Sequence, residues 1–193
     1  VVKNFRVLDN IEENIAISQP SKENMVIKVA GGKMKYYTSD WFDGDFPFLS
    51  INEDSMLLHT VRINVIKSTD SAYHIKTINF ARGNTPSVAA ANAGAFKLPV
   101  VQNDSVIQLG RGFPISKNNK FRNQKVLVVV EVPVGKKIMI DKSVDWYDWF
   151  NINVDRRRGI NIDWDERLDN SYSWKKNVQY IMTHEGLERT DRK

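Results

Sequence analysis

Short segments in which apolar and polar residues alternate dominate the chain and predict β-strands. The longest of them, Leu57–Lys67, reads LLHTVRINVIK. A period of two is typical of a strand with one buried face. The alternation resumes at Tyr73–Phe80 after the turn cluster Ser68–Ser71. Residues 57–80 are therefore predicted to form a β-hairpin.

Other short segments share this alternation or carry a brief aliphatic run. They are residues 11–17, 25–30, 34–39, 104–109, 137–140, 150–154, 159–164 and 180–183. Three in the C-terminal third (KKIMID, FNINVD and GINIDW) have similar sizes, as the rungs of a stacked coil would. We therefore predict a mainly all-β fold, a β-solenoid or β-helix-like stack of short strands, with a β-sandwich as the alternative.

The segment Gln124–Asp141 reads QKVLVVVEVPVGKKIMID and holds the strongest apolar run of the chain. Its first part, Val126–Val130, is apolar on both faces of a strand, which predicts a strand covered on both sides. The run is far shorter than the roughly 20 residues of a membrane-spanning helix. Pro133-Val134-Gly135 predicts a turn into a second strand.

One helix is predicted, inserted among the strands around residues 86–97. Thr85 is suited to the N-cap, and Pro86 to the first helical position, where its missing N–H costs nothing. The following residues are rich in alanine, and Pro99 ends the segment. Small side chains favour close packing of this helix on a β surface. We assign residues 1–60 to N-terminal strands of the same domain, residues 61–188 to the main β domain and residues 189–193 to a polar tail.

Composition narrows the function classes. The 193 residues include no cysteine, so disulfides, thiolate catalysis and cysteine zinc sites are excluded. The net charge of +5 is mild and does not by itself imply nucleic acid. The chain starts at Val1 without an initiator methionine or a signal-peptide pattern. We expect it to be a soluble piece of a longer protein.

Positive charge concentrates between Arg111 and Lys142, where eight basic residues stand against Glu131 and Asp141, a balance of +6. The candidate electrostatic contact surface consists of Arg111, Lys117, Lys120, Arg122, Lys125, Lys136 and Lys137. Such a surface suits a protein partner or an anionic membrane. No aromatic-rich basic motif and no helix-turn-helix pattern accompanies it, so no nucleic-acid contact is expected. A solvated loop explains the same charges equally well.

Patterns that would predict catalysis are weak. His59 and His74 lie on successive predicted strands, but the sequence places no third metal ligand beside them. His184 has no nucleophile near it, and no G-x-S-x-G motif occurs. We expect no metal, no cofactor and no enzyme activity.

Aspartates flank tryptophans in DWFD at 40–43, DWYD at 145–148 and DWD at 163–165. Such clusters occur at strand corners, where aspartate bonds its own backbone and tryptophan covers a core. They also suit a sugar platform with a general acid and base. The carbohydrate interpretation predicts Trp41, Trp146 and Trp149 in one exposed groove.

Four segments in order resemble a known family. VEVPVGKKIMID (130–141) is similar to a step of the toast-rack (DUF4097-like) β-domains. NFARGNTPSVAAANA (79–93), KNNKFRNQKVLVVVEVP (117–133) and YIMTHEGLE (180–188) resemble passages of PspC-type proteins of Bacteroidetes. Together they cover about residues 61–188.

The resemblance implies the soluble C-terminal domain of a multi-pass inner-membrane protein associated with envelope stress. It implies a repetitive β fold and carries over no catalytic residue. The expected role is sensing or scaffolding through protein or membrane-surface contacts, on a side of the membrane that the sequence leaves open. A homodimer is a further expectation, because an exposed strand edge invites pairing.

Overall fold

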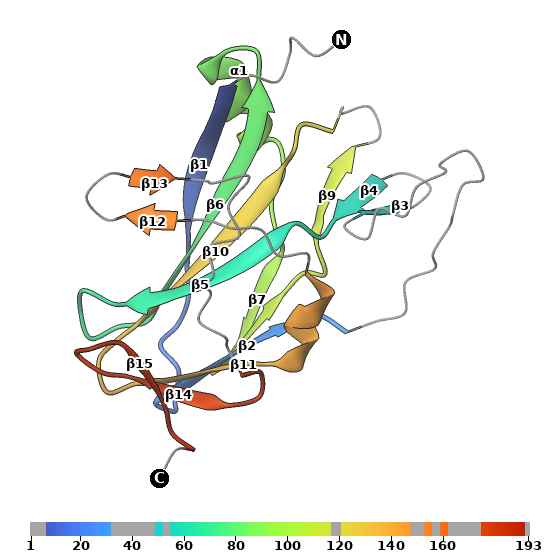
Figure 1. The fold of residues 1–193 in the computed structure, drawn as a ribbon. Helices are drawn as coiled ribbons and strands as arrows, with labels where there is room; N and C mark the ends of the chain where they lie inside the picture. Colours follow the sequence, from blue (N-terminus) through green and yellow to red (C-terminus); the bar gives the residue numbers. More distant parts are fainter. Residues whose placement is uncertain are drawn as a thin grey trace.

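Strands dominate the computed structural model of the chain, with one α-helix among them, which confirms the mainly β fold (Figure 1). The structure describes residues 7–31, 49–51, 55–116, 121–147, 153–155, 159–161 and 175–191. The strand predicted at residues 34–39 lies outside these residues.

A four-stranded sheet has the order β1-β6-β10-β5. Its strands are β1 (Val7–Ile15), β6 (His74–Gly83), β10 (Lys125–Val132) and β5 (Val61–Lys67). β1 and β6 are antiparallel over nine consecutive pairs, from Val7↔Gly83 to Ile15↔Ile75.

The predicted hairpin over residues 57–80 is wrong. β5 and β6 are consecutive in the chain, but β10 lies between them, parallel to β5 and antiparallel to β6. Val126–Val130 is apolar on both faces, so this segment buries more apolar surface in the centre of the sheet than at its edge. The turn between β5 and β6 is long enough for β10 to lie between these two strands.

The second large sheet has the order β15-β14-β11-β2-β8-β7. Its strands are β15 (Leu187–Arg189), β14 (Gln179–Met182), β11 (Lys137–Ile140), β2 (Asn24–Val29), β8 (Val106–Leu109) and β7 (Val100–Asn103). β2 occupies the middle and runs parallel to both neighbours, with Val26 opposite Met139 on one side and Val106 on the other.

Smaller elements complete the described fold. β4 (Ser55–Leu58) pairs with β3 (Leu49–Ile51) and β9 (Phe113–Ser116). β12 (Asn153–Asp155) and β13 (Gly159–Asn161) pair with each other, and a 3-10 helix spans Lys142–Trp146. β9 was missed, because Pro114 and the polar neighbours of this segment favour a loop.

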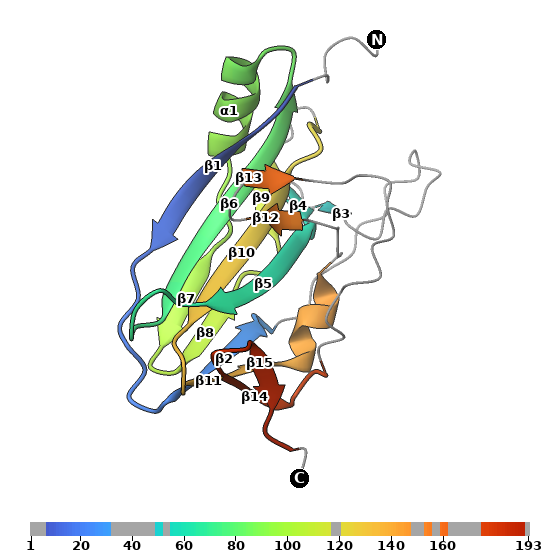
Figure 2. The ribbon, with the colours of Figure 1, turned by 60° about the vertical axis from the view of Figure 1, so that its left-hand side comes forward.

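The two large sheets share one hydrophobic core, and Figure 2 shows β7 and β8 passing behind β6 and β10. The even-numbered residues from Val126 to Val132 join this core. Leu127 and Val129 point the other way and form a second cluster with Ile78 and Phe80. Both faces of β10 are therefore buried, as its sequence predicted.

Helix α1 (Pro86–Gly94) packs on β1 and β6 at one end of the first sheet (Figure 1). The Thr85 side chain caps it by accepting a hydrogen bond from the Val88 N–H at 3.2 Å. The predicted helix around 86–97 is confirmed with an earlier end. The amide of Asn79, inside β6, donates to the carbonyls of Ala93 and Phe96 and ties the end of the helix to the sheet.

Parallel neighbours recur in both sheets, β5 with β10 and β2 with β8 and β11. Such neighbours fit the predicted stack, while a regular solenoid stays a prediction. The described parts of the three C-terminal segments are divided between two sheets: β11 lies in the six-stranded sheet, and β12 and β13 form their own hairpin.

Candidate functional surfaces

The structure divides the candidate basic residues between two places. Arg122 and Lys125 lie at the beginning of β10, and Lys136 and Lys137 follow its end. An eight-residue strand is about 26 Å long at roughly 3.3 Å per residue. The two pairs therefore do not form one patch. Lys117 and Lys120 lie outside the described residues.

Arg111 has a local structural role. It follows β8, and its Nε donates to the Ala30 carbonyl at 3.1 Å, just beyond the end of β2. Its own carbonyl oxygen lies 2.7 Å from Nδ1 of His59, a buried side chain. Arg111 thus joins the exit of β8, the end of β2 and the segment before β5.

Three turns meet at the end of the molecule where β10 finishes. We call this region the turn end; it comprises residues 68–73, 133–136 and 183–186. The Ser68 N–H donates to Val132 O at 2.8 Å and the Gly135 N–H to Met182 O at 2.8 Å. The ammonium group of Lys67 donates to His184 O at 3.1 Å. Two backbone hydrogen bonds and one from a lysine side chain thus connect the three turns.

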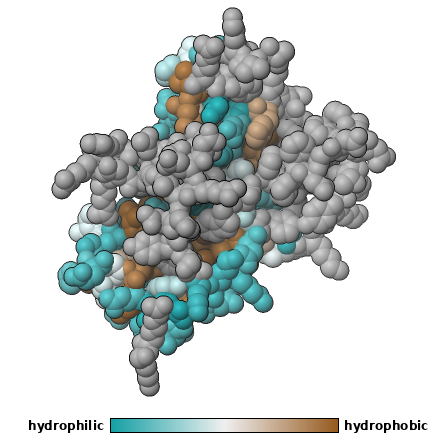
Figure 3. Space-filling model, viewed as in Figure 1, coloured by the Kyte–Doolittle hydropathy of each residue, from teal (hydrophilic) through white to brown (hydrophobic). Residues whose placement is uncertain are grey.

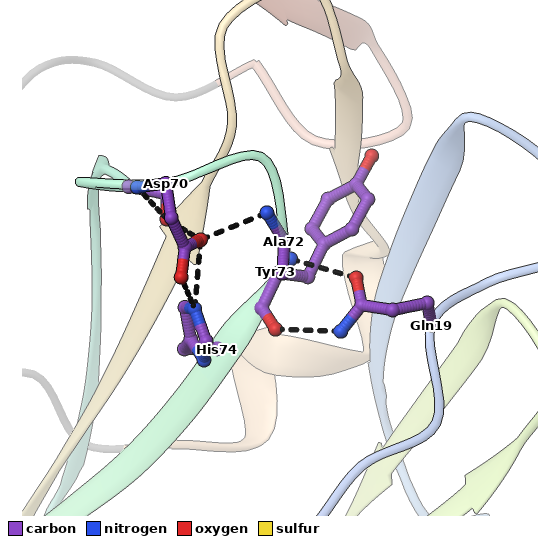
Figure 4. A network of polar contacts seen from close by, with 6 residues as sticks. Gln19, Asp70, Ala72, Tyr73 and His74 are labelled. Carbon is purple, nitrogen blue, oxygen red and sulfur yellow. Dashed lines mark hydrogen bonds and ion pairs between the residues drawn. The ribbon is translucent and has the colours of Figure 1, made fainter.

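The turn at residues 68–73 is organised by Asp70 (Figure 4). Its carboxylate accepts hydrogen bonds from the Ala72 N–H at 2.8 Å and from the Ser68 hydroxyl at 3.1 Å, and both oxygens lie 2.9 Å from Nε2 of His74. The bonds from Ala72 and His74 hold the pKa of Asp70 below its ordinary value. Ser68 bonds the aspartate and not the histidine, so no activated nucleophile is assembled.

Gln19 attaches the β1–β2 connection to the same turn, and Figure 4 shows its side chain facing Tyr73. Gln19 Oε1 accepts from the Tyr73 N–H at 2.8 Å, and Nε2 donates to the Tyr73 carbonyl at 3.0 Å. The Tyr73 hydroxyl donates to Lys137 O at 2.8 Å and so links the first sheet to the second. Burial raises the pKa of Tyr73 to about 12.

Two basic residues lie here: Lys136 in the turn end and Lys137 beside it, as the first residue of β11. Lys136 forms an exposed ion pair with Glu23, and this contact, with a smaller effect of Lys137, holds the pKa of Glu23 below its ordinary value. On the face seen in Figure 3, the coloured surface at the lower end is mainly hydrophilic. The turn end thus presents fixed charges on turns that are braced from two sheets.

The histidines do not converge. His59 precedes β5 and is buried, whereas His74 opens β6 beyond the far end of β5, on the surface. His184 belongs to the β14–β15 turn. Among the residues that the structure describes, no three histidine or carboxylate side chains are grouped to hold a metal ion.

The aspartate–tryptophan clusters lie almost wholly outside the described residues. Trp41 and Trp149 are not described, and neither is the side chain of Trp146. Asp141 caps the 3-10 helix by accepting from the Ser143 N–H at 2.8 Å, and Asp145 forms an ion pair with Lys176. The carbohydrate interpretation stays a prediction.

Sequence reasoning missed two glutamines that fix the connection between β1 and β2, Gln19 to the turn end and Gln102 to β7. Gln102 does for Ser18 what Gln19 does for Tyr73: its Oε1 accepts from the Ser18 N–H at 2.8 Å, and its Nε2 donates to the Ser18 carbonyl at 2.7 Å. Ser21 adds two bonds to Asp104, at 2.6 and 2.9 Å. A glutamine in a polar connection carries no local signal of such a role.

Comparison with known families gives one match. A family model described as "ToastRack found in some PspC" matches residues 50–192, about three quarters of the chain. No curated protein and no solved structure matches the chain. Within the described part, no helix has the length and apolar character needed to cross a membrane.

Proposed function

Because this chain belongs to the toast-rack domain family found in some PspC proteins, we propose that it is a non-enzymatic sensing or scaffolding domain. It acts in an inner-membrane envelope-stress protein, through contacts with a protein partner or with the membrane surface. The family match over residues 50–192 carries the proposal. The toast-rack domain is not a known enzyme family, which supports a binding role. The Bacteroidetes origin stays a prediction.

Lys136 and Lys137, at and beside the turn end, are better placed for a surface contact than Arg122 and Lys125 at the beginning of β10. Lys136 and Lys137 lie beside turns that several backbone hydrogen bonds connect, and the Tyr73 hydroxyl ties the backbone of Lys137 to the other sheet. A braced surface loses little conformational freedom on binding. Each basic residue near an anionic membrane contributes on the order of 1 kcal/mol.

Vesicle binding tests the proposal. The chain is mixed with vesicles of phosphatidylcholine alone or with a third of phosphatidylglycerol, and the bound fraction is measured at several salt concentrations. We expect binding to the anionic vesicles only, weakening as salt rises. In parallel, pull-down with purified membrane-stress proteins tests the protein-partner arm. Indifference to both would contradict the proposal.

Charge-reversal variants locate the contact. Lys136→Glu with Lys137→Glu changes the turn end, and Arg122→Glu with Lys125→Glu changes the opposite end of β10. Lys97→Glu with Lys142→Glu gives the same change in net charge at exposed residues elsewhere and serves as the matched control. We expect the turn-end variant to lose about tenfold or more in affinity at low salt, beyond any loss in the control.

A further inference from the structure

The free edges of the two large sheets differ in how they are protected. A strand edge offers unpaired backbone groups to any extended chain, and proteins usually blunt it with short strands, charged side chains (lysine above all), proline or a bulge. β7 and β15, at the edges of the six-stranded sheet, have four and three residues. β5 carries Arg62 and Lys67. These three edges follow the usual pattern.

β1 lacks the short length, proline, bulge and basic residues of such edges, and its only charged residues are acidic. It is nine residues long, VLDNIEENI, without proline or lysine, and its one-to-one register with β6 is unbroken by a bulge. In the part of the chain that the structure describes, β6 is its one strand neighbour. β1 forms the left margin of the ribbon in Figure 2, and Ile11 in its middle is 39% exposed. β1 therefore has a long edge to which a further strand can pair.

The charges of β1 indicate what kind of neighbour fits. Asp9, Glu12 and Glu13 make the strand acidic, with no basic residue among its nine. Lys76 of β6 lies 3.7 Å from Glu12, and Lys97, after α1, lies 2.7 Å from Glu13. Asp9 accepts a hydrogen bond from the Asn10 N–H. These two lysines compensate Glu12 and Glu13 only in part, since both ion pairs are partly exposed, and the strand itself stays acidic.

We propose that β1 accepts an extended, lysine- or arginine-bearing segment of a partner protein as an added strand. Backbone hydrogen bonds along β1 supply the affinity, and basic residues opposite Asp9, Glu12 and Glu13 select the partner. A second copy of this chain pairing through its own β1 is disfavoured, because it brings six carboxylates together. The inference rests on the proposed function and names one partner chemistry for it.

β1 precedes the residues that match the family, which begin at residue 50. The edge is therefore built by a part of the chain that lies outside the match. A partner selected by this edge would be specific to chains that carry the same N-terminal strand.

Hydrogen exchange of backbone amides in the full 193-residue chain tests the proposal. The probe is a capped nine-residue peptide in which lysine alternates with threonine and valine. One control peptide has glutamate in place of lysine. Another keeps the lysines but has proline at alternate positions, so that it has the same charge but cannot form a strand. We expect the first peptide alone to slow exchange in β1.

Variants separate charge from backbone pairing. Glu12→Lys with Glu13→Lys should weaken binding of the lysine peptide about tenfold at low salt and favour the glutamate peptide. Glu185→Lys with Glu188→Lys, in the β14–β15 hairpin, is the matched control and should leave β1 protection unchanged.

Protection of another edge by the lysine peptide, or equal protection by the proline peptide, would overturn the proposal. So would protection of β1 that rises with protein concentration without peptide, since this indicates a second copy. Vesicle binding by the turn end does not depend on β1. Failure of the peptide test therefore remains distinguishable from failure of the proposed function.

Discussion

The side-chain amide of Gln19 exchanges two hydrogen bonds with the backbone of Tyr73, much as a neighbouring strand would. The contact joins the connection between β1 and β2 to the first residue before β6. Because Tyr73 also donates to Lys137 O, one residue receives support from two directions. The position of the turn end thus depends on a side chain that belongs to none of its three turns.

Gln19→Ala should lower the free energy of unfolding by about 1–3 kcal/mol, because it leaves a partly buried N–H and carbonyl of Tyr73 without their partner. Urea denaturation followed by circular dichroism measures the change. Lys22→Ala, an exposed change in the same connection, should stay within about 0.5 kcal/mol. Equal effects of the two changes would contradict the bracing role.

Leu127→Ala should destabilise the fold by about 2–5 kcal/mol, because the side chain is fully buried between Ile78, Phe80 and Val129 on the face of β10 away from the main core. Thermal and urea unfolding measure the loss. Val101→Ala is the control, since Val101 is 61% exposed and should have almost no effect. A small loss at Leu127 would mean that the second cluster is loosely packed.

Gly83→Ala should destabilise by about 1–3 kcal/mol. A Cβ at this position would lie 2.5 Å from the backbone nitrogen of Ala89, so that α1 would have to shift away from β6. Gly31→Ala is the matched control, because its Cβ would meet nothing within 4 Å. Unfolding curves of both variants measure the loss of stability. A Gly83→Ala protein of unchanged stability and helix content would show that α1 is free to move.

The raised pKa of Tyr73 predicts that the folded protein loses stability in alkaline solution. Its pKa is raised from 10.0 to about 12, so the folded state holds the proton more tightly than the unfolded state. The contribution is complete below about pH 10 and is lost as pH rises towards 12. Tyr73→Phe should therefore show a smaller fall in unfolding free energy across this range. The difference in phenolate absorbance between the folded protein and the Tyr73→Phe variant reports the titration of Tyr73. Ionisation of Tyr73 near pH 10 would contradict the prediction.

Removal of residues 1–31 should prevent cooperative folding, because β2 is the middle strand that joins β11 to β8. The fragment 50–192, which is the part matched by the family, should therefore behave as a partly folded chain on its own. Circular dichroism and amide exchange measure its order. Mixing it with a separate peptide 1–31 should restore structure; a fragment that unfolds cooperatively alone would contradict this.

Local patterns predicted the elements well and their neighbours poorly. The strands β2, β8, β10 and β11 fall close to their predicted bounds, because alternation and aliphatic runs are local properties. The N-cap at Thr85 and the burial of both faces of β10 were also readable from the sequence. Pairing depends on which distant segment competes for an edge, so the insertion of β10 between β5 and β6 was missed.

The candidate surface was likewise predicted well in its composition and poorly in its arrangement in space. Counting lysines and arginines found the basic segment, but one strand, β10, carries its members to opposite ends. The acidic edge of β1 passed unnoticed because a strand becomes an edge only once the sheet order is known. Gln19 and Gln102 act through residues that are distant in sequence, which no local pattern reports.

The central place of β2 also governs the order of events during translation. Its partners β8 and β11 leave the ribosome long after it, since Val26 pairs with Val106 and Met139. Until then its Met25, Ile27 and Val29, which are buried in the finished fold, have no sheet to enter. A nascent chain of this design stays vulnerable to aggregation until most of it has been made, and its yield in cells will depend on how well that aliphatic segment is shielded meanwhile.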